Sequence, residues 1–148
     1  MSWRWAALLV VVCSAMMWST ALIFNAKMSH VDTEVPAWVM RGILMHESSS
    51  RYDENGAIVY VNRKRSKAGA AGPFQVMPAT FKLYAIEGER FEWLETDLGF
   101  AEDFAKRMLM QIYEDERSWT RALSVYNTGR VCSRGNIYAE EILKKGRP

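Results

Sequence analysis

The stretch ILMHESSSRYDENG, residues 43–56, ends a run of apolar residues with a single acid, Glu47, and then turns polar. Upstream, Pro36 suits the first turn of a helix, because the N–H that proline lacks would have no partner there. A helix from this point places one set of residues on a single face by the i, i+4, i+8 rule: Val39, Met40, Ile43, Leu44 and Glu47. The pattern therefore predicts a helix whose buried face ends in a carboxyl group.

The position of Glu47 predicts a raised pKa for its carboxyl group. Burial disfavours the charged carboxylate, and the partial negative charge at a helix C-terminus disfavours it further. Both effects move the pKa up from an ordinary value of about 4.3. A carboxyl group that stays protonated near neutral pH can donate a proton in a reaction, so Glu47 is the candidate general acid.

The rest of the chain reads as mostly helical with one small hairpin. AIVYV, residues 57–61, is the expected strand in a long polar connection, and RKRSK, residues 63–67, is its basic tip. The remaining helices are expected to begin at Pro78, to cover about 97–116, to lie between Ser118 and Gly129, and to cover about 136–145.

Composition limits the class of protein. A chain of 148 residues with 49% hydrophobic and 24% charged residues fits one globular domain. The net charge of +2, without interleaved basic and aromatic residues, argues against nucleic acid as a partner. The two cysteines, Cys13 and Cys132, form no Cys/His pattern with metal spacing, so we expect neither a metal site nor a cofactor.

The N-terminal segment predicts a membrane-spanning helix. Residues 5–24 carry no charged side chain, and at about 1.5 Å per residue they match the hydrocarbon core of a bilayer. Trp3, Arg4 and Lys27 flank the segment as interface residues do. We therefore expect an anchor over 1–27, a linker over 28–35 and a globular domain over 36–148. A cleaved signal peptide is the alternative for 1–27.

Four short motifs occur in order along the globular domain: ES at 47–48, GPFQ at 72–75, VYN at 125–127 and a tyrosine in the last helix, Tyr138. With the longer matches GPFQVMPAT and ALSVYNTG, they resemble the soluble lytic transglycosylase family over about 36–145. The resemblance implies a mostly α, lysozyme-like domain, related to goose-type lysozyme, with a small β-hairpin. Pro73, Phe74 and Val125 stand where the family usually has leucine, methionine and alanine.

The resemblance also implies roles for individual residues. Glu47 would be the catalytic acid and base, and Ser48 would support it by hydrogen bonding. Tyr126 would close the cleft near the acid, and Tyr138 would hydrogen-bond toward Glu47. The residues expected to contact the substrate are Gly72, Phe74, Gln75 and Asn127.

The distribution of acids favours a lyase. Glycosidases that hydrolyse their substrate ordinarily need two carboxylates. After Asp53 and Glu54, no acid occurs until Glu87, so the region expected to supply a second carboxylate has none. In the reaction of the family, the glutamic acid protonates the oxygen between N-acetylmuramic acid and N-acetylglucosamine. The muramic C6 hydroxyl then attacks C1, which gives a 1,6-anhydro ring without water.

The sequence thus predicts a membrane-tethered lytic transglycosylase that cleaves the glycan strands of peptidoglycan. It would be a single-pass inner-membrane protein, held through residues 5–24, with its catalytic domain in the periplasm. With a cleaved signal peptide it would be periplasmic, and a virion-associated location or an envelope-spanning complex stays open. Two other functions remain: a hydrolytic lysozyme of the goose type, and a wall-binding scaffold component in which turnover is dispensable.

Overall fold

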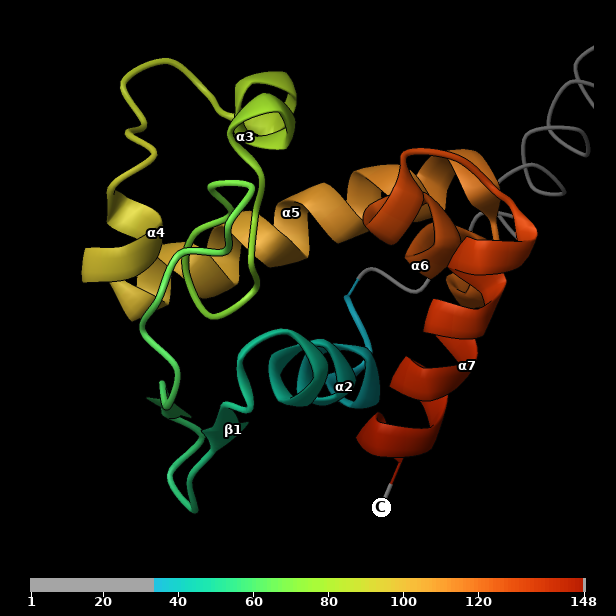
Figure 1. The fold of residues 1–148 in the computed structure, drawn as a ribbon, viewed down its shortest axis with the longest axis horizontal. Helices are drawn as coiled ribbons and strands as arrows, with labels where there is room; N and C mark the ends of the chain where they lie inside the picture. Colours follow the sequence, from blue (N-terminus) through green and yellow to red (C-terminus); the bar gives the residue numbers. More distant parts are fainter. Residues whose placement is uncertain (1–33, 148) are drawn as a thin grey trace, which may run out of the picture. The chain divides into compact units, whose positions relative to one another are not determined.

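The computed structural model describes residues 34–147, which form mostly helices and one small hairpin (Figure 1). The helices, in chain order, are α2 (Ala37–Ser48), α3 (Pro78–Tyr84), α4 (Trp93–Thr96), α5 (Leu98–Glu116), α6 (Trp119–Thr128) and α7 (Ser133–Gly146). Strands β1 (Arg51–Tyr52) and β2 (Ile58–Val59) are antiparallel. This composition of elements fits the expected lysozyme-like domain.

The predicted membrane helix at 5–24 and the anchor over 1–27 lie outside the described residues. Between residues 34 and 147, no helix has both the length and the apolar character needed to cross a bilayer. Val35, the last residue of the predicted linker, is 5% exposed and belongs to the hydrophobic core. The hydrophobic core thus includes a residue of the segment predicted as a linker.

Helices α2 and α7 pack closely and antiparallel. Three contacts define their register: Glu47 with Tyr138, Gly42 with Ile142, and Trp38 with Gly146. A Cβ on Gly42 would lie 2.5 Å from the carbonyl oxygen of Ile142, which is closer than real Cβ atoms come. The absence of a side chain at this position is thus what lets the two backbones approach.

Helix α5 runs between α4 at one end and α6 at the other (Figure 1). Asp97 caps it, because its carboxylate accepts a hydrogen bond of 2.9 Å from the backbone N–H of Phe100. Its apolar face is buried: Ala101, Phe104, Ala105, Met108, Leu109 and Ile112. The helix ends at Glu116, and the next residue, Arg117, takes the left-handed conformation with φ 54°. These bounds confirm the helix predicted over 97–116.

Other elements differ from the sequence prediction. Helix α4 has only four residues, which is too short for a periodic pattern to reveal. Helix α7 begins at Ser133, three residues before the expected 136. Within the strand predicted over 57–61, only Ile58 and Val59 pair with β1.

The basic tip at 63–67 is held to α4 by one arginine. Arg65 donates to both carboxylate oxygens of Glu95, at 2.9 and 2.6 Å, and its guanidinium lies 5.4 Å from the ring centroid of Phe91. These hydrogen bonds lower the pKa of Glu95. The tip is therefore attached to the fold through a two-pronged ion pair.

Candidate active site

Glu47 lies in the last turn of α2, and Ser49, the residue that follows this helix, takes the left-handed conformation. Its side chain is half-buried, and Tyr138 of α7 donates a hydrogen bond of 2.7 Å to Oε1. Burial raises the pKa of Glu47, as expected from the sequence, and this effect exceeds the opposing influence of Tyr138, His46 and Lys145. The carboxyl group thus tends to hold its proton.

Two tyrosines connect this acid to the neighbouring elements. The rings of Tyr126 on α6 and Tyr138 on α7 stack with centroids 6.2 Å apart and planes at 21°. The Tyr126 hydroxyl donates to the carbonyl oxygen of Phe74. Burial raises the pKa of both tyrosines well above the ordinary value, so both hydroxyls are neutral donors. The expected contact of Tyr138 with Glu47 is present.

His46 is a neighbour of the site that the sequence pattern did not single out. Its ring meets the edge of the Tyr138 ring at a centroid distance of 4.9 Å. Lys145 and Glu141 approach its Nδ1 at 2.8 and 3.3 Å. Residues 138, 141 and 145 share one face of α7, and this spacing is the signal that could have predicted the group.

The buried hydroxyl of Ser48, the residue after Glu47, bonds to the turn at 72–75 and not to Glu47. Ser48 is 2% exposed, and its hydroxyl lies 2.8 Å from the carbonyl oxygen of Pro73 and 2.7 Å from the hydroxyl of Ser50. The residue after the acid is thereby tied to the turn at 72–75. The predicted support of the acid by hydrogen bonds of Ser48 stays a prediction; the bonds of its hydroxyl are to Leu44, Ser50 and Pro73.

The turn at 72–75 packs against the core. Gly72 has φ 77°, and a Cβ there would clash with the carbonyl oxygen of Leu94 in α4, so both backbone angle and space require glycine. Gln75 has φ 48°, and its amide donates to the carbonyl oxygen of Gly72 at 2.9 Å, which holds the turn. The Phe74 ring is 1% exposed and lies in the core, which differs from the expected sugar contact.

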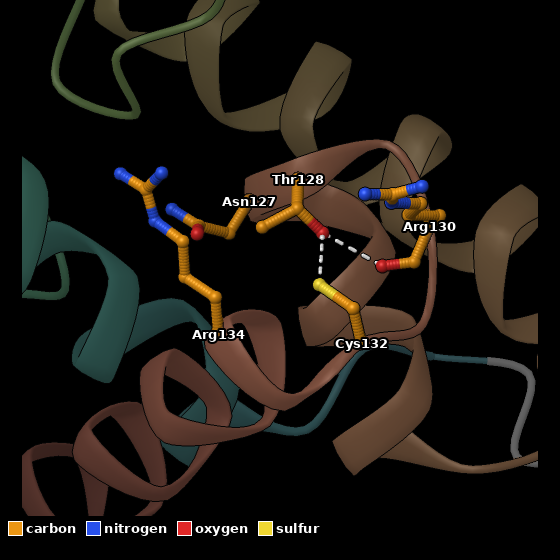
Figure 2. Close-up of a pocket in the computed structure, with 5 residues that line it drawn as sticks. All are labelled: Asn127, Thr128, Arg130, Cys132 and Arg134. Carbon is orange, nitrogen blue, oxygen red and sulfur yellow. Dashed lines mark hydrogen bonds between the residues drawn. The ribbon is translucent and has the colours of Figure 1, made fainter.

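Asn127 is exposed at the end of α6 and lines a pocket of about 370 Å³ (Figure 2). The other lining residues are Thr128, Arg130, Cys132 and Arg134. The sequence motifs did not single out Arg134, although it lies four residues before Tyr138 and hence on the same face of α7.

The groups around Glu47 are suited to proton transfer. Among the residues that the structure describes, no group of three or more His, Cys, Asp or Glu residues could hold a metal ion. The charged groups that act on the pKa of Glu47 are His46 and Lys145, and both lower it. A protonated carboxyl group held by a neutral tyrosine can serve as an acid and, after donation, as a base.

Comparison with known proteins agrees with this arrangement. The profile of one protein family, the transglycosylase SLT domain, matches residues 24–145. Comparisons with curated proteins and with solved structures gave no match. The matched range includes Glu47, the turn at 72–75 and both tyrosines. The chain therefore belongs to the transglycosylase SLT domain family, which indicates a lytic transglycosylase type of action on peptidoglycan.

Proposed function

We propose that this protein cleaves the β-1,4 bond between N-acetylmuramic acid and N-acetylglucosamine, with Glu47 as the only acid and base. The observation that carries the proposal is the half-buried Glu47 carboxyl group, with its raised pKa and the 2.7 Å hydrogen bond from Tyr138. Membership of the SLT family supports the substrate class.

The proposed reaction needs one proton, which returns to its donor. Protonated Glu47 gives its proton to the glycosidic oxygen as the bond from that oxygen to C1 of N-acetylmuramic acid breaks. The C6 hydroxyl of the same sugar then forms the new bond to C1, and its proton goes to the Glu47 carboxylate. Tyr138 keeps the carboxyl group oriented in both steps. Neutral Tyr126 holds the turn at 72–75 beside it through the Phe74 carbonyl.

The test is mass spectrometry of the products from purified sacculi, with the full chain beside its Glu47→Gln variant. We expect 1,6-anhydro-muropeptides from the wild type, and a rate about 10²- to 10⁴-fold lower for Glu47→Gln, as for loss of a general acid. Glutamine has nearly the same shape and can still accept from Tyr138, so it removes the proton and little else. Products with reducing ends would instead indicate a hydrolytic, goose-type lysozyme.

A scaffold role is distinguished in the cell. If the Glu47→Gln variant supported the biological process as well as the wild type does, the protein would be a wall-binding component with dispensable turnover. Loss of function in this variant, with normal abundance and location, supports the enzyme.

We also propose that residues 5–24 tether the enzyme to the inner membrane with the catalytic domain in the periplasm. The support is the uncharged length of this segment and its Trp, Arg and Lys flanks. Membrane fractionation combined with protease accessibility in spheroplasts tests the tether. A product found only in the soluble fraction would contradict it and favour a cleaved signal peptide.

A further inference from the structure

The first turn of α7 extends past the end of α2. Because the two helices are antiparallel with Glu47 opposite Tyr138, residues before Tyr138 lie beyond the last turn of α2. Helix α2 ends at Ser48, whereas α7 begins at Ser133, more than a turn before Tyr138. This turn of α7 is thus next to the acid, without α2 alongside it.

Arg134 lies on this turn and shares a helix face with Tyr138. Its side chain is exposed and lines the pocket of about 370 Å³ at the junction of α6 and α7. In Figure 2 the side chains of Arg134 and Asn127 extend to the same side of the pocket, away from that of Arg130. Asn127 directly follows Tyr126, which stacks on Tyr138. The two residues that line the pocket thus lie on the same helices, α6 and α7, that carry the tyrosine pair of the site.

The guanidinium of Arg134 has no acidic partner within residues 34–147. The ion pairs of this region involve other cations: His46, Arg65, Arg90, Lys106, Arg107 and Arg121. A guanidinium presents a planar set of donors that matches a carboxylate, and an adjacent amide adds a further donor. An unpaired arginine in a pocket beside an asparagine is thus suited to an anionic group of a ligand.

The pocket also favours negative charge at Cys132. The hydrogen bond with Thr128 lowers the pKa of the Cys132 thiol, and backbone N–H groups and the charge of Arg130 act in the same direction. These groups are independent of the Arg134 side chain. An anion entering the pocket would meet donors and positive charge on both sides.

We propose that Arg134 and Asn127 form a carboxylate-binding subsite that recognises the muramic acid side of the glycan strand. This inference rests on the proposed function, since it names the portion of the substrate that the pocket selects. N-acetylmuramic acid differs from N-acetylglucosamine by a lactyl group. That group bears a carboxylate when free, or carries the stem peptide with carboxylates of its own. A neutral chitin strand offers no such group.

The test measures binding in the full chain carrying Glu47→Gln, in detergent where residues 5–24 require it, by isothermal titration calorimetry. The probes are the disaccharide N-acetylglucosamine–N-acetylmuramic acid with a tetrapeptide stem, the same disaccharide with a free lactyl carboxylate, and neutral chitotetraose. Arg134→Gln is compared with Arg134→Lys, which keeps the charge, and with Arg117→Gln. Arg117 lies just before the N-terminus of α6, and the length of α6, about 15 Å, separates it from the pocket end of that helix. The Arg117→Gln variant makes the same change in net charge as Arg134→Gln.

We expect Arg134→Gln to weaken binding of at least one carboxylate probe about fivefold, with chitotetraose changed less than twofold. An effect on the tetrapeptide probe alone assigns the site to the stem peptide, and an effect on the free lactyl probe assigns it to the lactyl group. Arg134→Lys should restore some of the affinity, and Arg117→Gln should change none. Equal losses for all three probes, or no loss for any, would overturn the proposal. If the wild type formed no anhydro products, the proposed function would fail, but these affinities would still decide the subsite.

Discussion

The two sides of Glu47 are built in different ways. On one side, α2 and α7 pack with their backbones in contact at Gly42 and Gly146. Tyr138 of α7 is buried there and donates its hydrogen bond to Glu47 of α2. On the other side, residues 51–70 are mostly exposed, and their hairpin pairs only two residues of each strand. The helical side fixes the acid and its hydrogen-bond donor. The connection contributes little to the core.

The largest effect on the free energy of unfolding should follow a substitution at the contact of α2 with α7. Gly42→Ala places a Cβ 2.5 Å from the carbonyl oxygen and 2.6 Å from Cγ2 of Ile142. A backbone atom cannot move aside without separating the helices, so we expect a loss of about 2–3 kcal/mol in the free energy of unfolding. Urea denaturation followed by circular dichroism measures it.

Gly99→Ala is the matched control for that change. In α5 its Cβ would meet only the Asp97 carboxylate, at an ordinary 3.4 Å, and alanine favours a helix more than glycine does. This variant should be neutral or slightly more stable. Equal losses for the two variants would show that close packing is not specific to the helical side of the acid.

The second effect concerns the hydrogen bond to the acid. Tyr138→Phe keeps the ring against His46 and Tyr126 but removes the donor to Oε1 of Glu47. We expect kcat to fall about tenfold, which corresponds to about 1.4 kcal/mol. Because this hydrogen bond lowers the pKa of Glu47, its loss raises that pKa further. The protonated form would then persist to higher pH, so the alkaline limb of the kcat/KM profile should move up.

Tyr126→Phe separates this electrostatic effect from general damage. Tyr126 donates to the Phe74 carbonyl and makes no hydrogen bond to Glu47. Loss of the Tyr126 hydroxyl can lower kcat by loosening the turn at 72–75. The alkaline limb of the kcat/KM profile should stay at the same pH as in the wild type. A limb that moved equally in both variants would contradict a specific link between Tyr138 and the acid.

A smaller effect on stability is expected at the hydrogen bond that joins Ser48, the residue after Glu47, to the turn at 72–75. Ser48→Ala removes the hydroxyl that lies 2.8 Å from the Pro73 carbonyl, and the buried oxygen loses this partner. A loss of about 1 kcal/mol in stability is expected, together with a raised KM if the turn borders the substrate. The exposed neighbour Ser49 offers the control, since Ser49→Ala removes no bond of this kind. Similar losses in both would argue against the link.

The same contrast explains what the sequence could predict. The burial and raised pKa of Glu47 follow from the spacing of its apolar neighbours along one helix, and α5 follows from the helical spacing of its long apolar face. The partner of Ser48 lies 25 residues away in the chain, and the burial of Phe74 depends on how the turn at 72–75 meets the core. No local pattern encodes such contacts. Arg134 could have been found from its spacing to Tyr138, but its lack of a partner required the structure.

The smallest effect should lie in the connection itself, at the ion pair of Arg65 with Glu95. Both side chains face solvent, so Arg65→Gln should leave the melting temperature almost unchanged at neutral pH, even though the pair is two-pronged. The folded pKa of Glu95 is lowered below its ordinary value, so any stability from the pair is present at neutral pH and is lost as the pH falls through that lowered pKa. Wild type and variant should therefore have the same melting temperature in acid and in high salt, and Glu95→Gln should behave as Arg65→Gln does. A loss as large as that of Gly42→Ala would mean that the connection is held as firmly as the helical side, and the contrast between the two sides of the acid would fail.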